Sequence, residues 1–338
     1  MINIISTQPR AREVHGPYKV YANLLKGLDS IGYPYLVNAD LNATKRLWVH
    51  DDKAALQFLR RSRAYKVLGP NIVSLPTQLP SLEFDNTIYV LPSEWPVQLW
   101  RQMGFNACPL IPWPVGIDTD EFHPSRTPKW ERRVMVYHKG RRVSELITIL
   151  DVLYALRLRY SLVIYGRYGE EEYREFLNKS SFVIWHGVSE TQGIAMQEAM
   201  ACSIPILVCD VSTLGDDAEG SAYPDKLKAL PVTAAPYFDK TCGIRITNLV
   251  DLKDAVCSLL DEIDDYRPRE YVLEHLSLER QASRFVQLWE TWGLGVDKGY
   301  GERPATLKPF TEPTSARVQR LAYKAMRELF PPSDERNG

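Results

Sequence analysis

Apolar and polar positions follow two different periods along this chain, and their alternation predicts an α/β protein. Short apolar runs typical of buried strands are separated by segments in which apolar residues recur every three or four positions, as on one helix face. The run over 2–6 leads through a glycine-containing loop to helical spacing at Val20, Leu24 and Leu28, and then to a second apolar run over 33–39. Strand, loop, helix and strand in this order are typical of the start of a doubly wound α/β domain.

The alternation continues and starts again beyond residue 133, so we expect two such domains. Further strands are predicted over 46–50, 64–69, 87–92, 108–115, 133–140, 160–166, 181–187 and 204–210. Helices are predicted over 52–62, 95–104, 144–156, 170–180, 249–264 and 278–292. The polar, proline-bearing segment 123–133 is typical of a linker, and 338 residues suit two domains of about 150 residues each. The expected division is an N-terminal domain over 1–125, a C-terminal domain over 126–285, and a last helix and tail over 286–338.

The composition is that of an ordinary globular protein and narrows the function only a little. Lys and Arg number 41 against 42 Asp and Glu, a formal net charge of −1, so no overall basic excess favours nucleic acid. The five cysteines form no C-x-x-C pair, which predicts free thiols in a reducing compartment, the cytoplasm, and argues against structural zinc. The first residues become charged too soon for a signal peptide, and no apolar run approaches the roughly 18 residues of a membrane span.

The segment 188–208, "VSETQGIAMQEAMACSIPILV", carries the clearest candidate chemistry. A helix starting near Gly193, capped by Ser189 or a neighbour, would present free N–H groups and a partial positive charge to a phosphate. The glycine lets the backbone approach a ligand closely. Glu190 and Glu198 stand on either side of it, roughly 12 Å apart if the whole stretch were helical. Carboxylates accept hydrogen bonds from paired hydroxyls, so a nucleotide sugar is a ligand that suits this arrangement.

This segment also resembles the E-x7-E motif of retaining GT-B glycosyltransferases, especially glycosyltransferase family four, whose pattern is S-x-x-E-G-F-G-L-x-x-x-E-A-M-A-x-G-x-P-V. Earlier in the chain, "IPWPVGIDTDEFHP" (111–124) is similar to the family's interdomain signature P-N-G-V-D-x-x-x-F-x-P. The pieces "HGPYKVYANLLKGLDSIGYPY", "VYHKGRR" and "PYFDKTCG" match family segments in order, so the resemblance covers about residues 1–290. Departures are Thr191-Gln192 in place of Gly-Phe and Ser203 in place of the glycine before the proline.

The resemblance implies the fold and the site. The fold is two Rossmann-like domains facing across a cleft, with a C-terminal helix that crosses back to the first domain. The implied catalytic residues are Glu190, Lys139, Arg141 and Arg142, and the implied donor-binding residues are Glu198, Gly193, Ile194, Gly16, His50, Thr191 and Gln192.

Each of these residues has an implied role. Glu198 would bind the ribose hydroxyls, and Glu190 would lie beside the hydroxyls of the transferred sugar. Lys139 and one of the two arginines, which the resemblance does not distinguish, would clamp the diphosphate. Such cations take the place of a metal ion, so no metal is expected. His50 stands near a family histidine at the sugar site, although a plain capping role explains it equally well.

The implied activity is transfer of a hexose, with retention of configuration, from a UDP- or GDP-sugar to a hydroxyl of a glycan or lipid-linked oligosaccharide. One alternative acceptor is DNA with a modified base, for which the basic segments 44–46 and 59–63 are the candidate contacts. A second alternative is a catalytically degenerate nucleotide-sugar-binding protein. A nicotinamide dehydrogenase is disfavoured because no G-x-G-x-x-G follows the first strand.

The basic amphipathic segment 316–330 is interpreted as a packed helix, with peripheral membrane contact as the less favoured function.

Overall fold

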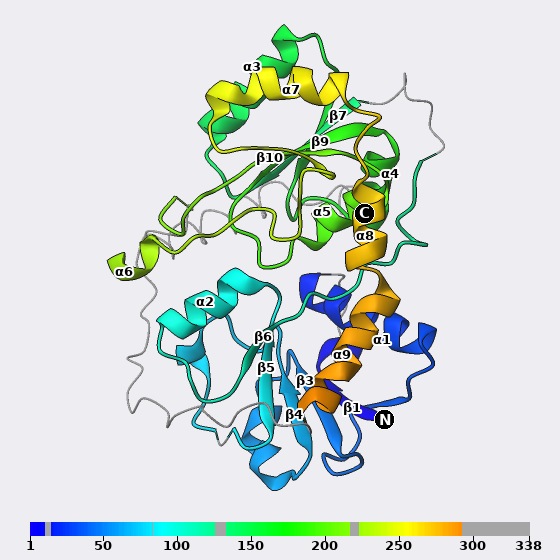
Figure 1. Ribbon diagram of the computed structural model, residues 1–338, viewed down its shortest axis with the longest axis vertical. Coiled ribbons are helices and arrows are strands. Elements are labelled where there is room, and N and C mark those ends of the chain that lie inside the picture. Colours follow the sequence, from blue (N-terminus) through cyan, green and yellow to red (C-terminus); the bar gives the residue numbers. More distant parts are fainter. Residues whose placement is uncertain (11–14, 83, 126–132, 217–222, 293–338) are drawn as a thin grey trace, which may run out of the picture. The chain divides into compact units, whose positions relative to one another are not determined.

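The computed structural model describes residues 1–292 except 11–14, 83, 126–132 and 217–222 (Figure 1). The described residues divide into two α/β units: the first contains Met1–Asp118 and residues 274–292, and the second contains Thr119–Leu273. The sequence had placed these divisions near 125 and 285. Most of the predicted linker and the whole tail beyond 292, with its amphipathic segment 316–330, lie outside the described residues.

The first unit is a parallel sheet covered by helices on both faces. Its elements are β1 (Ile2–Ser6), α1 (Gly16–Ser30), β2 (Tyr35–Val37), β3 (Arg46–His50), β4 (Tyr65–Leu68), β5 (Thr87–Leu91), α2 (Glu94–Gln102), β6 (Leu110–Pro112) and α9 (Leu278–Trp292). The strand order is β2-β1-β3-β4-β5-β6, and every pair is parallel. One face packs on α2 through Trp100 and Tyr89, whose ring centroids are 4.6 Å apart. The other face packs on α9, where Phe285 touches Trp48 and Trp113.

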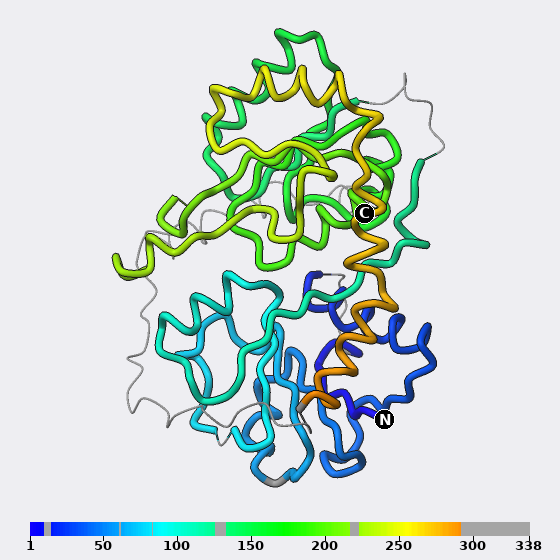
Figure 2. Tube along the Cα trace, in the orientation of Figure 1, coloured from blue at the N-terminus to red at the C-terminus, as the bar shows by residue number. Residues whose placement is uncertain are grey.

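Helix α9 returns to the first unit and lies along α1, so that the orange and blue ends of the described chain are side by side (Figure 2). The contact is close because Gly27 of α1 has no side chain. A Cβ built at Gly27 would lie 2.7 Å from the Leu278 carbonyl oxygen and 2.9 Å from Ala282 Cβ. A helix that follows the second unit in the sequence thus completes the apolar core of the N-terminal sheet, as the fold prediction required.

We expect Gly27→Ala to destabilise the protein in spite of alanine's better helix propensity. The propensity gain is about 0.5–1 kcal/mol, whereas forcing extra volume into a packed contact costs about 1–3 kcal/mol. Urea unfolding should therefore show a net loss on the order of 1 kcal/mol. Gly16→Ala is the matched control because a Cβ there would meet nothing within 4 Å. Equal stability of the two variants would contradict the close α1–α9 contact.

The second unit is also a parallel sheet between two helical layers. Its elements are β7 (Arg133–Lys139), α3 (Val143–Ala155), β8 (Tyr160–Ile164), α4 (Glu170–Asn178), β9 (Ser180–Gly187), α5 (Ile194–Ala201), β10 (Ile206–Cys209), α6 (Asp225–Lys228), β11 (Gly243–Ile246), α7 (Leu252–Asp261) and α8 (Pro268–His275). The strand order is β11-β10-β9-β7-β8, with every pair parallel. Helices α3 and α7 cover one face, and α4 packs on the other through Tyr173 against Tyr137 (Figure 1).

The structure differs from the predicted elements at a few places. The segment predicted as a helix over 52–62 forms a 3-10 helix, Ala55–Arg61. The strand predicted over 108–115 is limited to Leu110–Pro112, since a proline donates no hydrogen bond to a neighbouring strand. Strand β11 and helix α8 were not predicted. Within the described residues, no helix is both long enough and apolar enough to cross a membrane.

In each sheet the strand order reverses direction between two adjacent central strands. In the first sheet the chain goes from β1 to β2 on one side and from β3 to β4 on the other. In the second sheet it goes from β7 to β8 on one side and from β9 to β10 on the other. Ligands of doubly wound folds bind outside the carboxyl ends of such strands. The carboxyl ends here are Ser6 and His50 in the first unit and Lys139 and Gly187 in the second. Several of the predicted site residues therefore stand at the expected edges.

Candidate functional site

An ion pair marks the carboxyl edge of the second sheet. Lys139 and Gly187, the last residues of β7 and β9, are register partners. The Lys139 Nζ atom donates to Glu190 Oε1 at 2.7 Å, and the two side chains are 23% and 10% exposed. The same ammonium lies 4.3 Å from the centroid of the Tyr165 ring. The structure thus brings together two residues that the sequence assigned to catalysis, and joins the end of β7 to the loop before α5.

Helix α5 begins at this loop with a glycine, which leaves room for an anion to approach the first N–H groups of the helix. Gly193 is its N-cap, with φ 79° and ψ 45°, a left-handed conformation that glycine adopts at no steric cost. The N-cap position belongs to Gly193 and not to Ser189, and a glycine has no side chain with which to cap the helix. The first N–H groups of the helix, beginning with that of half-buried Ile194, therefore receive no cap from the N-cap residue's own side chain.

The two residues between Glu190 and Gly193 have different environments. Thr191 is exposed. Gln192 is buried; its Nε2 donates to Gln197 Oε1 at 3.0 Å, while Gln197 Nε2 donates to the Gln192 carbonyl at 2.9 Å. Gln192 thus fixes the loop to the side of α5, whereas Thr191 is the member of this pair that a ligand can reach from solvent.

Glu198 lies deeper than the sequence suggested. It is only 1% exposed and faces the tyrosines of the α4 side. Burial, with a smaller contribution from the Glu198 carboxylate, raises the pKa of both Tyr168 and Tyr173. The Tyr173 hydroxyl donates to the Ala195 carbonyl of α5 at 2.6 Å. The two glutamates of the motif therefore differ in kind: Glu190 pairs with Lys139 at the edge, and Glu198 lies inside the unit.

The structure distinguishes the two arginines that the resemblance left open. Arg141 Nε donates to Glu145 Oε2 at 2.8 Å, and its Nη1 lies 3.5 Å from the carbonyl oxygens of Gly187 and Cys209. Arg141 therefore reaches the carboxyl ends of both β9 and β10. Arg142 is exposed at the N-cap of α3. Arg141 is the better placed of the two to face a ligand at this edge.

A buried chain of polar groups supports Arg141, and most of it was missed from the sequence. Glu145 Oε2 also accepts from His186 Nε2 at 3.1 Å, and His186 Nδ1 lies 3.0 Å from His138 Nδ1. Burial lowers the pKa of His186 to about 4 and also lowers the pKa of His138. Both rings are therefore neutral at pH 7. The available signal for Glu145 was its position four residues after Arg141 at the start of a helix.

In the first unit, His50 is a buried neutral side chain at the end of β3. Its Nδ1 lies 3.4 Å from Ser6 Oγ, and its Nε2 lies 3.2 Å from Asn71 Nδ2. Burial lowers the pKa of His50 to about 3. The ring therefore joins the ends of β1 and β3 rather than capping a helix.

Gly16, the other predicted residue of this unit, is the exposed first residue of α1, next to the N-cap His15. A side chain at Gly16 would meet nothing within 4 Å. Packing within this unit therefore does not require a glycine at this position. Among the residues that the structure describes, no group of three or more His, Cys, Asp or Glu side chains could hold a metal ion.

Comparisons with known proteins identify the fold. No protein-family model and no curated protein matches the sequence. The structure is similar to sucrose-phosphate synthase from Thermosynechococcus elongatus over 87% of this chain and 99% of that one, with a TM-score of 0.56 and 13% identity. It is also similar to Anabaena HepE in complex with UDP and glucose, over 86% of this chain and 99% of that one, with a TM-score of 0.54 and 9% identity. The predicted pair of parallel-sheet α/β domains is thus confirmed, and the chain has the GT-B fold of glycosyltransferases.

Proposed function

We propose that this protein is a retaining glycosyltransferase similar to family four, which moves a hexose from a UDP- or GDP-sugar to a hydroxyl of a glycan or lipid-linked oligosaccharide. One observation carries the proposal. The Lys139–Glu190 ion pair stands beside the glycine-initiated end of α5, at the strand edge where doubly wound folds bind ligands. The HepE structure, which has the same fold, was solved with UDP and glucose.

The donor's diphosphate is the group that this edge suits best. The N–H groups at the start of α5 attract an anion, and Lys139 and Arg141 bring two cationic side chains from the same edge of the sheet. These groups would stabilise the charge that develops on the leaving nucleoside diphosphate, which is the role that a metal ion has in other transferases. We therefore propose a metal-independent reaction.

The bond changes in the proposed reaction need no side-chain base. The bond between the sugar's anomeric carbon and the diphosphate oxygen breaks, and the acceptor oxygen bonds to the same face of that carbon. The acceptor's proton passes to the departing diphosphate oxygen. Glu190 would orient the sugar by accepting from its hydroxyls, and Glu198 would accept from the ribose hydroxyls. The free cysteines, four of them buried, suit a protein that works in the reducing cytoplasm.

Thermal unfolding in the presence of UDP, GDP and their common sugar derivatives, with and without EDTA, tests this proposal. A ligand that binds only the folded state stabilises it by about 2.7 kcal/mol at a hundredfold excess over its dissociation constant. We expect one nucleotide to raise the melting temperature, equally with and without EDTA. Lys139→Gln should reduce this shift.

The matched control is Lys26→Gln, which removes a lysine from a 2.7 Å ion pair with Asp118 in the first unit and should keep the shift. Absence of a shift with every nucleotide at millimolar concentration would contradict the proposal. A shift without turnover of any nucleotide sugar would instead favour the catalytically degenerate binding protein.

A further inference from the structure

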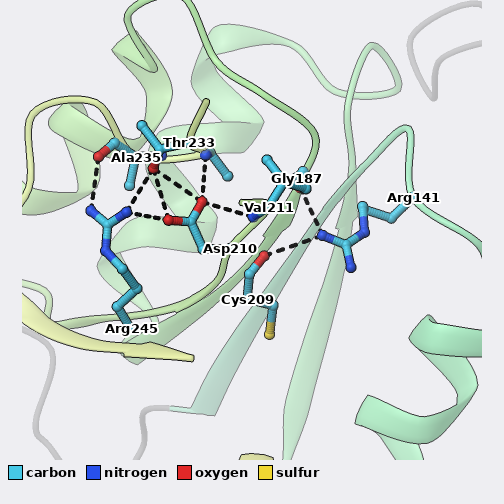
Figure 3. A network of polar contacts seen from close by, with 9 residues as sticks. Arg141, Gly187, Cys209, Asp210, Val211, Thr233, Ala235 and Arg245 are labelled. Atoms are coloured by element: carbon cyan, nitrogen blue, oxygen red, sulfur yellow. Dashed lines mark hydrogen bonds and ion pairs between the residues drawn. The ribbon is translucent and has the colours of Figure 1, made fainter. Parts of the chain in front are cut away.

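A buried carboxylate beside the proposed site holds a loop of the second unit in place. Asp210 follows β10 and is 6% exposed. Its Oδ1 accepts from the backbone N–H of Val211 at 2.9 Å and of Ala234 at 2.6 Å. The Thr233 hydroxyl lies 2.8 Å from its Oδ2, and Arg245 of β11 forms an ion pair with the same oxygen (Figure 3). A carboxylate with this many charge-assisted bonds fixes the groups around it firmly.

The bonds of Thr233 show how firmly the loop is held. A hydroxyl offers one donor and two acceptor positions. The donor goes to Asp210, and the acceptors take Arg245 Nη1 at 2.7 Å and the Ala235 backbone N–H at 3.0 Å. Arg245 Nη2 also donates to the Ala235 carbonyl at 3.1 Å (Figure 3). The Thr233 side chain therefore has all of its hydrogen-bonding capacity engaged within this network.

The main chain of Thr233 also holds the loop before α5, which carries Glu190. The Thr233 carbonyl accepts from the backbone N–H of Glu190 at 3.0 Å. Glu190 in turn accepts from Lys139 at 2.7 Å. A continuous series of bonds thus runs from Asp210 through Thr233 to the backbone of Glu190 and on to the ion pair at the sheet edge.

We propose that Asp210, Arg245 and Thr233 are positioning residues that hold Glu190 in the geometry required for sugar transfer. They act through the Glu190 backbone and not by touching the substrate. The catalytic consequence rests on the proposed function, but the mechanical link from Thr233 to Glu190 does not. The two parts of the inference are therefore measured separately.

Thr233→Val and Thr233→Ser form a matched pair for the test. Valine keeps the shape of threonine without its hydroxyl, whereas serine keeps the hydroxyl. By hydrogen exchange, the Glu190 amide should exchange at least about tenfold faster in Thr233→Val and at nearly the parental rate in Thr233→Ser. Amides of β7 and β9, which report global opening, should be unchanged in both. Equal Glu190 exchange in the two variants would overturn the link.

Kinetics test the catalytic part. With the nucleotide sugar that stabilises the parent protein, Thr233→Val should lower kcat by about 10- to 100-fold, because small displacements of a positioned group have effects of this size. The KM for the donor and the affinity for UDP or GDP should change less than about threefold, and Thr233→Ser should restore kcat. A parental kcat in Thr233→Val, or an equal loss in kcat and nucleotide affinity, would overturn the positioning role.

Two further results keep the test decisive. If Thr233→Val lowers the melting temperature strongly, Arg245→Gln replaces it, since the Arg245 side chain is 35% exposed and its loss disturbs the core less. If no nucleotide binds the parent protein, the proposed function fails, while the exchange rates of Glu190 still decide whether Thr233 holds it.

Discussion

Glu198→Ala is expected to weaken binding of the donor nucleotide strongly, whereas Glu190→Ala is expected mainly to slow transfer. The buried Glu198 is proposed to accept from ribose hydroxyls, and hydrogen bonds to a charged group contribute about 1.5–3 kcal/mol. Removing them should raise the dissociation constant about 10- to 100-fold. Glu190, at the sheet edge and paired with Lys139, should affect the nucleotide little and the sugar greatly. Calorimetric titration with UDP and GDP, and turnover of the matching nucleotide sugar, measure the two effects.

Size-preserving variants separate these effects from simple loss of packing. Glu198 is 1% exposed, so alanine leaves a void that glutamine does not. Glu198→Gln should keep most of the stability but still lose nucleotide affinity. The control is Glu175→Gln, which replaces an exposed glutamate of α4 that pairs with Lys179. It should leave both the nucleotide affinity and the turnover at parental values. Equal losses of affinity and turnover in the Glu190 and Glu198 variants would contradict the site assignment.

Acidification should begin to destabilise the protein near pH 6.5, which is above the pH range in which most carboxylates titrate. Burial lowers the pKa of His186 to about 4 and that of His50 to about 3. The ordinary histidine pKa is about 6.5, so below this pH the unfolded chain binds protons that the folded protein does not. Stability is therefore fully present above about pH 6.5 and falls as the pH is lowered toward 4. Each histidine should contribute a slope of about 1.4 kcal/mol per pH unit in this range.

Urea unfolding between pH 7.5 and 4.5 measures this slope. His50→Gln should be less stable than the parent at pH 7.5, because it disturbs the contacts with Ser6 and Asn71, but it should lose less stability on acidification. Gly16→Ala is the control, since it removes no titratable group and its Cβ would meet nothing within 4 Å, and it should keep the parental pH dependence. If His50→Gln and the parent lose stability in parallel, the buried neutral state of His50 is wrong.

The sequence predicted the fold where burial makes the pattern unambiguous. Strands β1 and β9 are buried almost throughout, and such parallel strands appear in the sequence as continuous apolar runs. The segment 52–62 has the apolar spacing of a helix, and spacing alone does not separate an α-helix from the tighter 3-10 helix that forms there. Strand β11 has four residues and begins with Gly243, whose Cβ would lie 2.0 Å from the Ile206 carbonyl oxygen. A strand of only four residues that begins with a glycine leaves little periodic signal.

The candidate site was predictable only as far as it is local in sequence. Glu190, Gly193 and Glu198 belong to one continuous motif, and Lys139 follows an obvious strand. Asp210 and Arg245, by contrast, are brought together across two neighbouring strands, and nothing in either local segment points to the other. The depth of Glu198 was missed for a similar reason, because it depends on Tyr168 and Tyr173 from another helix and its preceding loop.

The return of α9 to the first unit also determines when that unit can become complete during synthesis. The ribosome makes proteins from the N-terminus, so β1 to β6 emerge before the helix that covers one face of their sheet. Trp48 and Trp113 meet their partner Phe285 only after the stretch Thr119–Leu273 of the second unit has been translated. The described part of the second unit is one stretch, Thr119–Leu273, and needs no later segment for its sheet. The sheet formed by β1 to β6 is therefore the last to bury its apolar surface, and during synthesis this surface stays exposed for longer than that of the second sheet.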